Sequence, residues 1–298
     1  MSNLLVIGAL ALDRPVWVEG PLRAGGRLRG RTLGGAFEGR LGGGGANAGC
    51  ALAAAGHAVM AGSVLADDDD GRRVRALAQA AGLDLTLVSS RSGASSRTMI
   101  LLEPSGERTI VVLDGAMPDP RPGLDPPSRH PQVRPEGAFI RSPYPGAADW
   151  ARATAGPVVL HWPAPGYDGK ADLVVASAED LPAGMAQDPF EAAASRLGAR
   201  LQWLVLTHGA DGAVAHGKAG ARIAAKAPPA VTRDATGAGD IFAAGLLDAL
   251  TGGAAMDQAL AHACAWGAAA VGLEGSAPVG APAGTFRPWS GEALAELA

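Results

Sequence analysis

The sequence has no excess of positive charge and almost no cysteine. Its 298 residues carry 25 Lys and Arg against 29 Asp and Glu, and the formal net charge is −4. A chain with this charge creates no general attraction for a nucleic-acid backbone. The two cysteines, Cys50 and Cys264, are far apart and set among alanines, which favours buried thiols over a disulfide or a zinc site. We therefore expect neither nucleic acid nor a thiolate-bound metal as a partner.

A long hydrophobic run is also missing. The segment MSNLLVIGALALD has no basic residues ahead of its apolar stretch, and Asp13 follows too soon for a membrane-spanning helix. The segment is typical of a first β-strand in a cytoplasmic protein that has no membrane partner. Hydrophobic residues make up 48% of the chain, which is enough to bury a full core.

Short apolar segments alternate with alanine-rich helical patterns, which favours an α/β fold with a largely parallel sheet. Strands are expected at residues 4–10, 98–103, 109–114, 138–142, 158–162, 173–177 and 203–208, and helices at 46–55, 71–81 and 241–250. Residues 14–42 interleave Gly and Arg with brief apolar stretches and are expected to form most of a small β lid. The proline-rich segment 117–135 indicates a surface loop. We expect residues 1–298 to form one domain.

The stretch DATGAGDIFAAG, residues 234–245, places small residues and a carboxylate at the start of an amphipathic helix. Gly237, Ala238 and Gly239 would present backbone N–H groups to a phosphate, helped by the helix dipole. Asp240 would repel that phosphate unless it acts as a general base that takes a proton from an attacking hydroxyl. From these residues alone, an ordinary N-cap aspartate is an equally good explanation. A GxxxxGK[ST] pattern is absent, and so is a GxGxxG pattern after the first strand.

The stretch RLGGGGANAG, residues 40–49, has four consecutive glycines ahead of Asn47. Glycine lets the backbone approach a ligand closely, and the Asn47 amide can both donate and accept hydrogen bonds, which suits a polyhydroxylated ligand. A flexible hinge followed by a helix-capping asparagine explains the stretch equally well.

Together, GGGGAN near the N-terminus and DATGAGD near the C-terminus resemble the signatures of the PfkB or ribokinase family of carbohydrate kinases. Further similarities are Asp13 after the first strand, AGSVLADDDDGRRV, EPSGERTIV, WLVLTHGADGAV and a final alanine-rich helix before EGSAP. The resemblance implies a ribokinase-like, doubly wound, mostly parallel sheet flanked by helices, with a small β lid. It also implies ATP-dependent phosphorylation of a hydroxyl on a small sugar or sugar-like substrate.

The resemblance assigns roles to the residues at matching positions. It makes Asp240 the catalytic base, with Gly237, Ala238 and Gly239 as the anion hole. Substrate contacts fall at Asp13, Gly43, Gly44 and Asn47, and ATP contacts at Thr207 and Gly209 together with Gly237 and Gly239.

Metal ions are implied as well. Asp180 and Glu179 match a segment that helps to hold Mg²⁺ through water, and Asp234 and Thr236 are available for a monovalent cation such as K⁺. The run Asp67–Asp70 precedes a helix, and we expect it to supply N-terminal helix charges rather than a metal site.

Three departures from the family pattern bear on the substrate. Ser177 stands where relatives usually carry Asn ahead of the carboxylate, Gly44 stands where ribokinases show Lys, and the segment AFIRS offers no acidic sugar contact. The last two count against ribose itself. For His161 and Trp162, a structural role is favoured over a place in the cleft.

Two alternatives stay open, an adenosine-type nucleoside kinase of the same fold and a non-catalytic sugar or nucleotide sensor on a kinase fold. Segment 14–42 also has more apolar side chains than a solvated loop should expose, namely Val16, Trp17, Val18, Leu22, Leu28, Leu33 and Phe37. We expect these residues to cover the substrate cleft or to join two copies of the chain in a homodimer through the lid.

Overall fold

A computed structural model describes residues 1–32, 39–95, 97–105, 108–113, 123–181, 188–198, 200–273, 275, 277–279 and 281–290. Within these residues a nine-stranded sheet forms the body of the protein, in the order β14-β13-β12-β11-β10-β9-β1-β5-β6. Its strands are β1 (Asn3–Ile7), β5 (Ala58–Ala66), β6 (Leu83–Arg91), β9 (Gly137–Ile140), β10 (Val158–His161), β11 (Leu173–Ser177), β12 (Trp203–Thr207), β13 (Ala213–Gly217) and β14 (Arg222–Ala225). Only β13 and β14 run antiparallel to their neighbours, so the expected α/β fold with a mostly parallel sheet is confirmed.

The strand order reverses at β1. From β1 the chain first builds outward through β5 and β6, and it then returns to the other side of β1 with β9. Ligands of doubly wound sheets bind outside the carboxyl ends of the strands at such a reversal. The ends of β1 and β9, at Ile7 and Ile140, therefore mark the expected place of a site.

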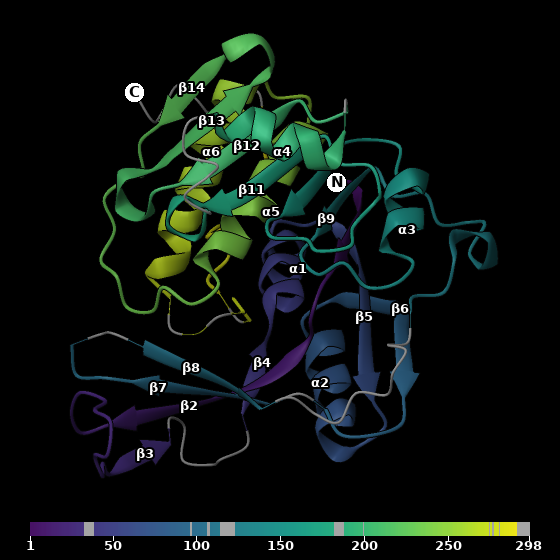
Figure 1. Cartoon of the computed structure of the whole chain (residues 1–298). Helices are drawn as coiled ribbons and strands as arrows, with labels where there is room; N and C mark the ends of the chain where they lie inside the picture. The colour runs from purple at the N-terminus through teal and green to yellow at the C-terminus, as the bar shows by residue number, and fades with distance from the viewer. Residues whose placement is uncertain are drawn as a thin grey trace.

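Helices cover both faces of the body (Figure 1). Alternate residues of a strand point to opposite faces: Leu4 and Val6 share a core with α1 (Gly44–Ala54), α2 (Asp69–Ala80), α5 (Ala238–Thr251) and α6 (Met256–Val271). Leu5 and Ile7 share the opposite core with α3 (Ala147–Ala153) and α4 (Pro189–Leu197). Short 3₁₀ helices lie at Pro127–Arg129, Ala178–Asp180, Gly209–Asp211 and Lys218–Gly220. Within the described ranges, every helix is too short or too polar to cross a bilayer.

A second, smaller sheet is set apart from the body, at the lower left of Figure 1. Its strands are β2 (Ala11–Val18), β3 (Gly30–Thr32), β4 (Arg40–Gly42), β7 (Arg97–Leu102) and β8 (Arg108–Leu113). The sequence segments 98–103 and 109–114 are strands as expected, but they pair in this small sheet and not in the body. The small sheet therefore extends beyond residues 14–42.

Exposed apolar side chains occur in segment 14–42, at Leu22 and Leu28, and on β8, outside that segment. Ile110, Val111, Val112 and Leu113 are all exposed, whereas Val18 is buried within the chain. Leu33 and Phe37 lie outside the described residues. The homodimer stays a prediction, and β8 offers it more apolar surface than β2 does.

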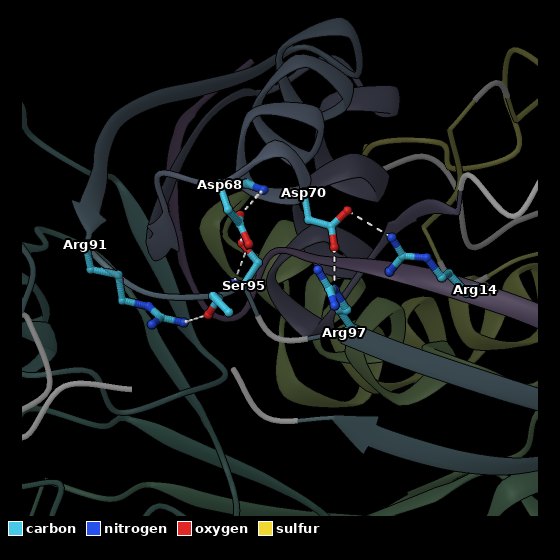
Figure 2. Close-up of polar contacts among 8 residues, drawn as sticks. Arg14, Asp68, Asp70, Arg91, Ser95 and Arg97 are labelled. Atoms are coloured by element: carbon cyan, nitrogen blue, oxygen red, sulfur yellow. Dashed lines mark hydrogen bonds and ion pairs between the residues drawn. The ribbon is translucent and has the colours of Figure 1, made fainter. Parts of the chain in front are cut away.

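Carboxylates at the start of α2 fasten the small sheet to the body (Figure 2). Asp68 is the N-cap and accepts hydrogen bonds from the Gly71 and Ser95 backbone N–H groups, at 2.8 Å each. Asp70 binds Arg14 of β2 at 2.9 Å and Arg97 of β7 at 2.6 Å. The run Asp67–Asp70 thus contains helix N-terminal charges, as expected, and these charges also hold the small sheet.

A buried polar network joins the two ends of the chain to the helices. Asp248 of α5 contacts Nε2 of His57 at 2.8 Å and Nε2 of His262 at 2.7 Å, and it accepts the Trp289 backbone N–H at 2.8 Å. Ser2 N donates to Nδ1 of His57, so the His57 Nε2 carries the proton that Asp248 accepts. Burial opposes ionisation of Asp248, but the hydrogen bonds from His262 and His57 outweigh it and lower its pKa.

Replacing Asp248 should therefore destabilise the fold in a pH-dependent way. Asp248→Asn should lower the free energy of unfolding at pH 7 by about 3 kcal/mol, because buried donors lose their charged acceptor. A carboxylate with a depressed pKa stabilises the folded state above its unfolded pKa, and this contribution is lost as the pH falls through the folded pKa. Urea unfolding at a series of pH values should show the gap between wild type and variant closing in acid. In the exposed control Asp257→Asn the change should stay within about 1 kcal/mol. A pH-independent gap would contradict the ionic role.

Candidate active site

The loop ahead of α5 forms a glycine-lined helix start. Gly237 is the N-cap of α5 and has a φ of 78°, a left-handed conformation that favours glycine. A Cβ added at Gly239 would meet no heavy atom within 4 Å, so the space beside this residue is open. The first turn of a helix has N–H groups without intrahelical acceptors. Gly237–Gly239 can therefore receive an anion, with Asp240 in the same turn.

On the opposite side of the site, β2 and β4 shape the glycine run. Asp13 is buried, and a Cβ at Gly42 would lie 1.9 Å from its Oδ2, so only glycine fits beside this carboxylate. Gly43 is the N-cap of α1 with a φ of 88°, and a Cβ there would lie 2.5 Å from Ala9 O. The glycines are thus required by close backbone approach and do not form a hinge. Asn47 follows in the first turns of α1 and is buried.

The two glycine motifs meet at Asp240. Asn47 Nδ2 donates to Asp240 Oδ2 at 2.9 Å, and Arg141 Nε donates to Asp240 Oδ1 at 2.7 Å. The Asp240 carboxylate is buried, and each of its oxygens still has a second lone pair for another donor. Asn47 Oδ1 is buried and has no hydrogen-bond partner among the described residues, so it can accept a hydrogen bond from a ligand.

Two more polar side chains lie near Asp240, namely Arg141, which no sequence motif indicates, and His161, for which the sequence favours a structural role. Arg141 follows β9 and His161 ends β10, so both lie at the carboxyl edge of the sheet beside the strand-order reversal. Burial lowers the pKa of His161 to about 4, and the charge of Arg141 adds to this effect. The ring is therefore neutral near pH 7. The available signal was positional, since polar residues at the ends of neighbouring parallel strands converge.

The residues assigned to ATP lie further along the same edge. Thr207 ends β12 and pairs with Ser177, the last residue of β11. Gly209 has a φ of 57°, and a Cβ there would meet no heavy atom within 4 Å. Glu179 and Asp180 lie in the 3₁₀ turn Ala178–Asp180 that follows Ser177, and the charge of Asp180 acts on His161. In the described part of the chain, no cluster of three or more His, Cys, Asp or Glu side chains could hold a metal by itself.

Asp234 lies just ahead of the glycine loop. Its Oδ1 accepts the Thr236 backbone N–H at 2.9 Å, and its Oδ2 accepts from Arg40 Nη2 at 3.1 Å. Burial opposes ionisation of Asp234, but the bonds from Thr236 and Arg40 outweigh it and lower its pKa. Asp234 is therefore held as an anion beside the helix start.

A doubly wound sheet, a small second sheet and a carboxylate in the first turn of a glycine-capped helix define the ribokinase-like class of α/β proteins. The model of the pfkB family of carbohydrate kinases matches residues 1–127 and 167–283, so the chain belongs to this family. No curated protein sequence matches the chain.

Solved structures support the same fold. The ribokinase of Thermotoga maritima is 17% identical with a TM-score of 0.72, covering 94% of this chain and 96% of its own. The Arabidopsis thaliana ribokinase complexed with ribose and ATP is 21% identical with a TM-score of 0.72, covering 93% and 95%. A Burkholderia thailandensis nucleoside kinase in complex with inosine is 21% identical with a TM-score of 0.69, covering 93% and 92%.

Two glycine substitutions should separate the packed side of the site from its open side. In Gly44→Ala the added Cβ would lie 2.6 Å from Arg141 Cγ and 3.0 Å from Asp240 Oδ1, so we expect a loss of about 1–2 kcal/mol in the free energy of unfolding. Gly239→Ala adds a methyl group to open space and should cost less than about 0.5 kcal/mol. Urea unfolding of both variants measures this difference. Equal losses would mean that the Arg141 and Asp240 side chains are not packed against Gly44.

Proposed function

We propose that this protein transfers the γ-phosphoryl group of ATP to a hydroxyl of a small sugar or sugar-like acceptor. The observation that carries the proposal is the position of the Asp240 carboxylate, which Asn47 and Arg141 hold next to the Gly237–Gly239 helix start. A base at this point can take the proton of a hydroxyl while the helix start receives the phosphoryl charge. Membership of a carbohydrate kinase family supports the same reaction.

The acceptor is proposed to bind between the small sheet and the carboxyl edge of the body. Asp13, Gly43, Gly44 and Asn47 would contact its hydroxyl groups, because Asp13 and Asn47 offer buried hydrogen-bonding atoms on this side. The small sheet would act as a lid that excludes water, so that ATP is transferred to the acceptor and not hydrolysed.

Arg141 extends the catalytic proposal. Its side chain is 36% exposed, and among the described residues its only polar side-chain contact is the one from Nε to Asp240. The terminal nitrogens are thus available to a phosphoryl oxygen near the helix start. A guanidinium at this point would stabilise the charge of the transferring group, as arginines do in other phosphoryl-transfer enzymes.

ATP is proposed to lie along Thr207 and Gly209, with its γ-phosphate at Gly237 and Gly239. Mg²⁺ commonly uses one or two carboxylates, phosphate oxygens and water, and the pair Glu179 and Asp180 fits that requirement. Held there through water, the ion would neutralise part of the phosphate charge. No preformed cage of protein ligands is needed for this.

A coupled ADP-release screen tests the proposed reaction and identifies the acceptor. The panel should contain neutral sugars, sugar acids, sugar phosphates and nucleosides, because the fold is shared by ribokinases and nucleoside kinases. Acceptor-dependent ADP release supports a kinase and distinguishes a sugar from a nucleoside. Ligand binding without any ADP release would favour a sensor on a kinase fold.

Asp240→Asn should abolish most of the turnover and leave ATP binding nearly unchanged. The amide keeps the shape of the side chain but cannot accept the proton, so kcat should fall by roughly 10²–10⁴. Steady-state kinetics gives kcat, and equilibrium titration with ATP gives its affinity. A variant that keeps wild-type kcat would show that Asp240 is not the base.

A reciprocal pair of variants tests the arrangement of the two substrates. Asp13→Asn should lower kcat/KM for the acceptor by a factor equivalent to about 1–3 kcal/mol of activation free energy, the cost of a buried hydrogen bond. The KM for ATP should stay unchanged. Thr207→Ala should do the reverse, raising the KM for ATP alone. Initial rates with each substrate varied in turn measure both effects. If Asp13→Asn weakened only ATP, the acceptor side would be misassigned.

A further inference from the structure

Three separate parts of the chain meet at Asp234. The backbone N–H of Asp234 donates to Val271 O at the end of α6, at 3.2 Å. Its Oδ1 accepts the Thr236 N–H at 2.9 Å, and its Oδ2 accepts the Gly275 N–H at 3.3 Å. Because Asp234 begins the loop that leads to Gly237, its position sets where the helix start lies.

The positive charge beside this carboxylate comes from the small sheet. Arg40 begins β4, and its Nη2 lies 3.1 Å from Asp234 Oδ2. The Asp234 side chain is 7% exposed and that of Arg40 is 28% exposed, so the pair is largely shielded from water. Gly275 makes room for the guanidinium, because a Cβ at this position would lie 2.9 Å from Arg40 Nη1. Gly275 also has a φ of 108°, which favours glycine in its own right.

A monovalent cation does not fit at Asp234 and Thr236 in this arrangement. N–H donors already point at both carboxylate oxygens, and one of these donors carries a full positive charge. A second cation at contact distance would be repelled by the guanidinium in a poorly solvated place. Of the side-chain oxygens of these two residues, only Thr236 Oγ1 is left without such a donor. A single hydroxyl cannot replace the hydration shell of an ion.

We propose that Arg40 is a built-in cation that holds the Gly237–Gly239 loop in place through Asp234, so that catalysis needs no added K⁺. This inference rests on the proposed kinase function and concerns the regulation of the same site. Arg40 is a positioning residue, since it acts on the helix start through Asp234.

Because Arg40 lies in β4, its charge also links the glycine run at residues 42–45 to the loop ahead of α5. In the pairing of β2 with β4, Arg40 lies opposite Asp13, and the same short strand continues to Gly42 and the acceptor glycines. Arg108 of β8 adds a contact from its Nη2 to Ala235 O at 3.4 Å. One strand therefore joins the acceptor loop to the helix start, and the small sheet supplies the cation beside Asp234.

The test compares wild type with Arg40→Ala in KCl and in choline chloride at equal ionic strength. Wild-type kcat, measured with an acceptor from the ADP-release screen, should be the same in both salts. Arg40→Ala should lower kcat by roughly ten- to a hundredfold in choline chloride, because a small misplacement of the helix start is enough to cost that much. The substitution removes the guanidinium and leaves an empty space beside the Asp234 carboxylate and Thr236 Oγ1. K⁺ or methylguanidinium should therefore restore part of the lost rate in a saturable way.

Two further variants and a second readout keep the test decisive. Arg97→Ala removes another arginine of the small sheet, one that binds Asp70 and not the loop, and it should create no response to K⁺ (Figure 2). Arg40→Lys keeps a positive charge, so its kcat should stay independent of K⁺. This variant can be tested if Arg40→Ala does not fold. Melting temperatures in the two salts can be measured without kinase activity. K⁺ should raise the melting temperature of Arg40→Ala and of no other variant.

Wild-type kcat that depends on K⁺ would overturn the proposal. So would an Arg40→Ala protein that is fully active, or one whose rate and melting temperature both ignore K⁺ and methylguanidinium. If the screen finds no acceptor, the proposed kinase function fails, while the melting temperatures still decide whether Arg40 occupies a cation position.

Discussion

The Asp240 carboxylate is held from two sides, by Asn47 of α1 and by Arg141 after β9, and the arrangement of the site follows from these two contacts. A buried carboxylate is costly unless donors surround it. The helices α1 and α5 and the end of β9 therefore cannot move apart without leaving a charge unpaired. This requirement places the N-terminal glycine run against the C-terminal helix start.

Arginine and aspartate pairs also set the small sheet on the body. The body supplies carboxylates at Asp70 and Asp234, and the small sheet supplies Arg14, Arg97 and Arg40. The contacts of Asp70 fix the small sheet at the start of α2, and the contact of Asp234 links it to the loop ahead of α5. The small sheet is also joined to the body by apolar packing, because Leu12 of β2 and Leu41 of β4 belong to the core that α1, α2, α5 and α6 share.

Much of the architecture could be predicted from short patterns. The strands of the body between β9 and β12 and the helices α1, α2 and α5 were expected close to their observed bounds, since buried parallel strands are short apolar runs. β5 and β6 were missed, because their segments are rich in small or polar residues. β7 and β8 were expected as strands, but an apolar run does not tell which sheet a strand will join.

The sequence by itself determined the local chemistry, namely a glycine-capped helix start, a carboxylate in its first turn and a second glycine run with Asn47. These are properties of neighbouring residues and of the backbone conformations that glycine permits. Only the tertiary structure decided which distant groups meet: Asn47 and Arg141 reach Asp240 across 193 and 99 residues, and Arg40 reaches Asp234 across 194. A buried charge requires a partner, but the order of strands in the sheet selects which side chain supplies it.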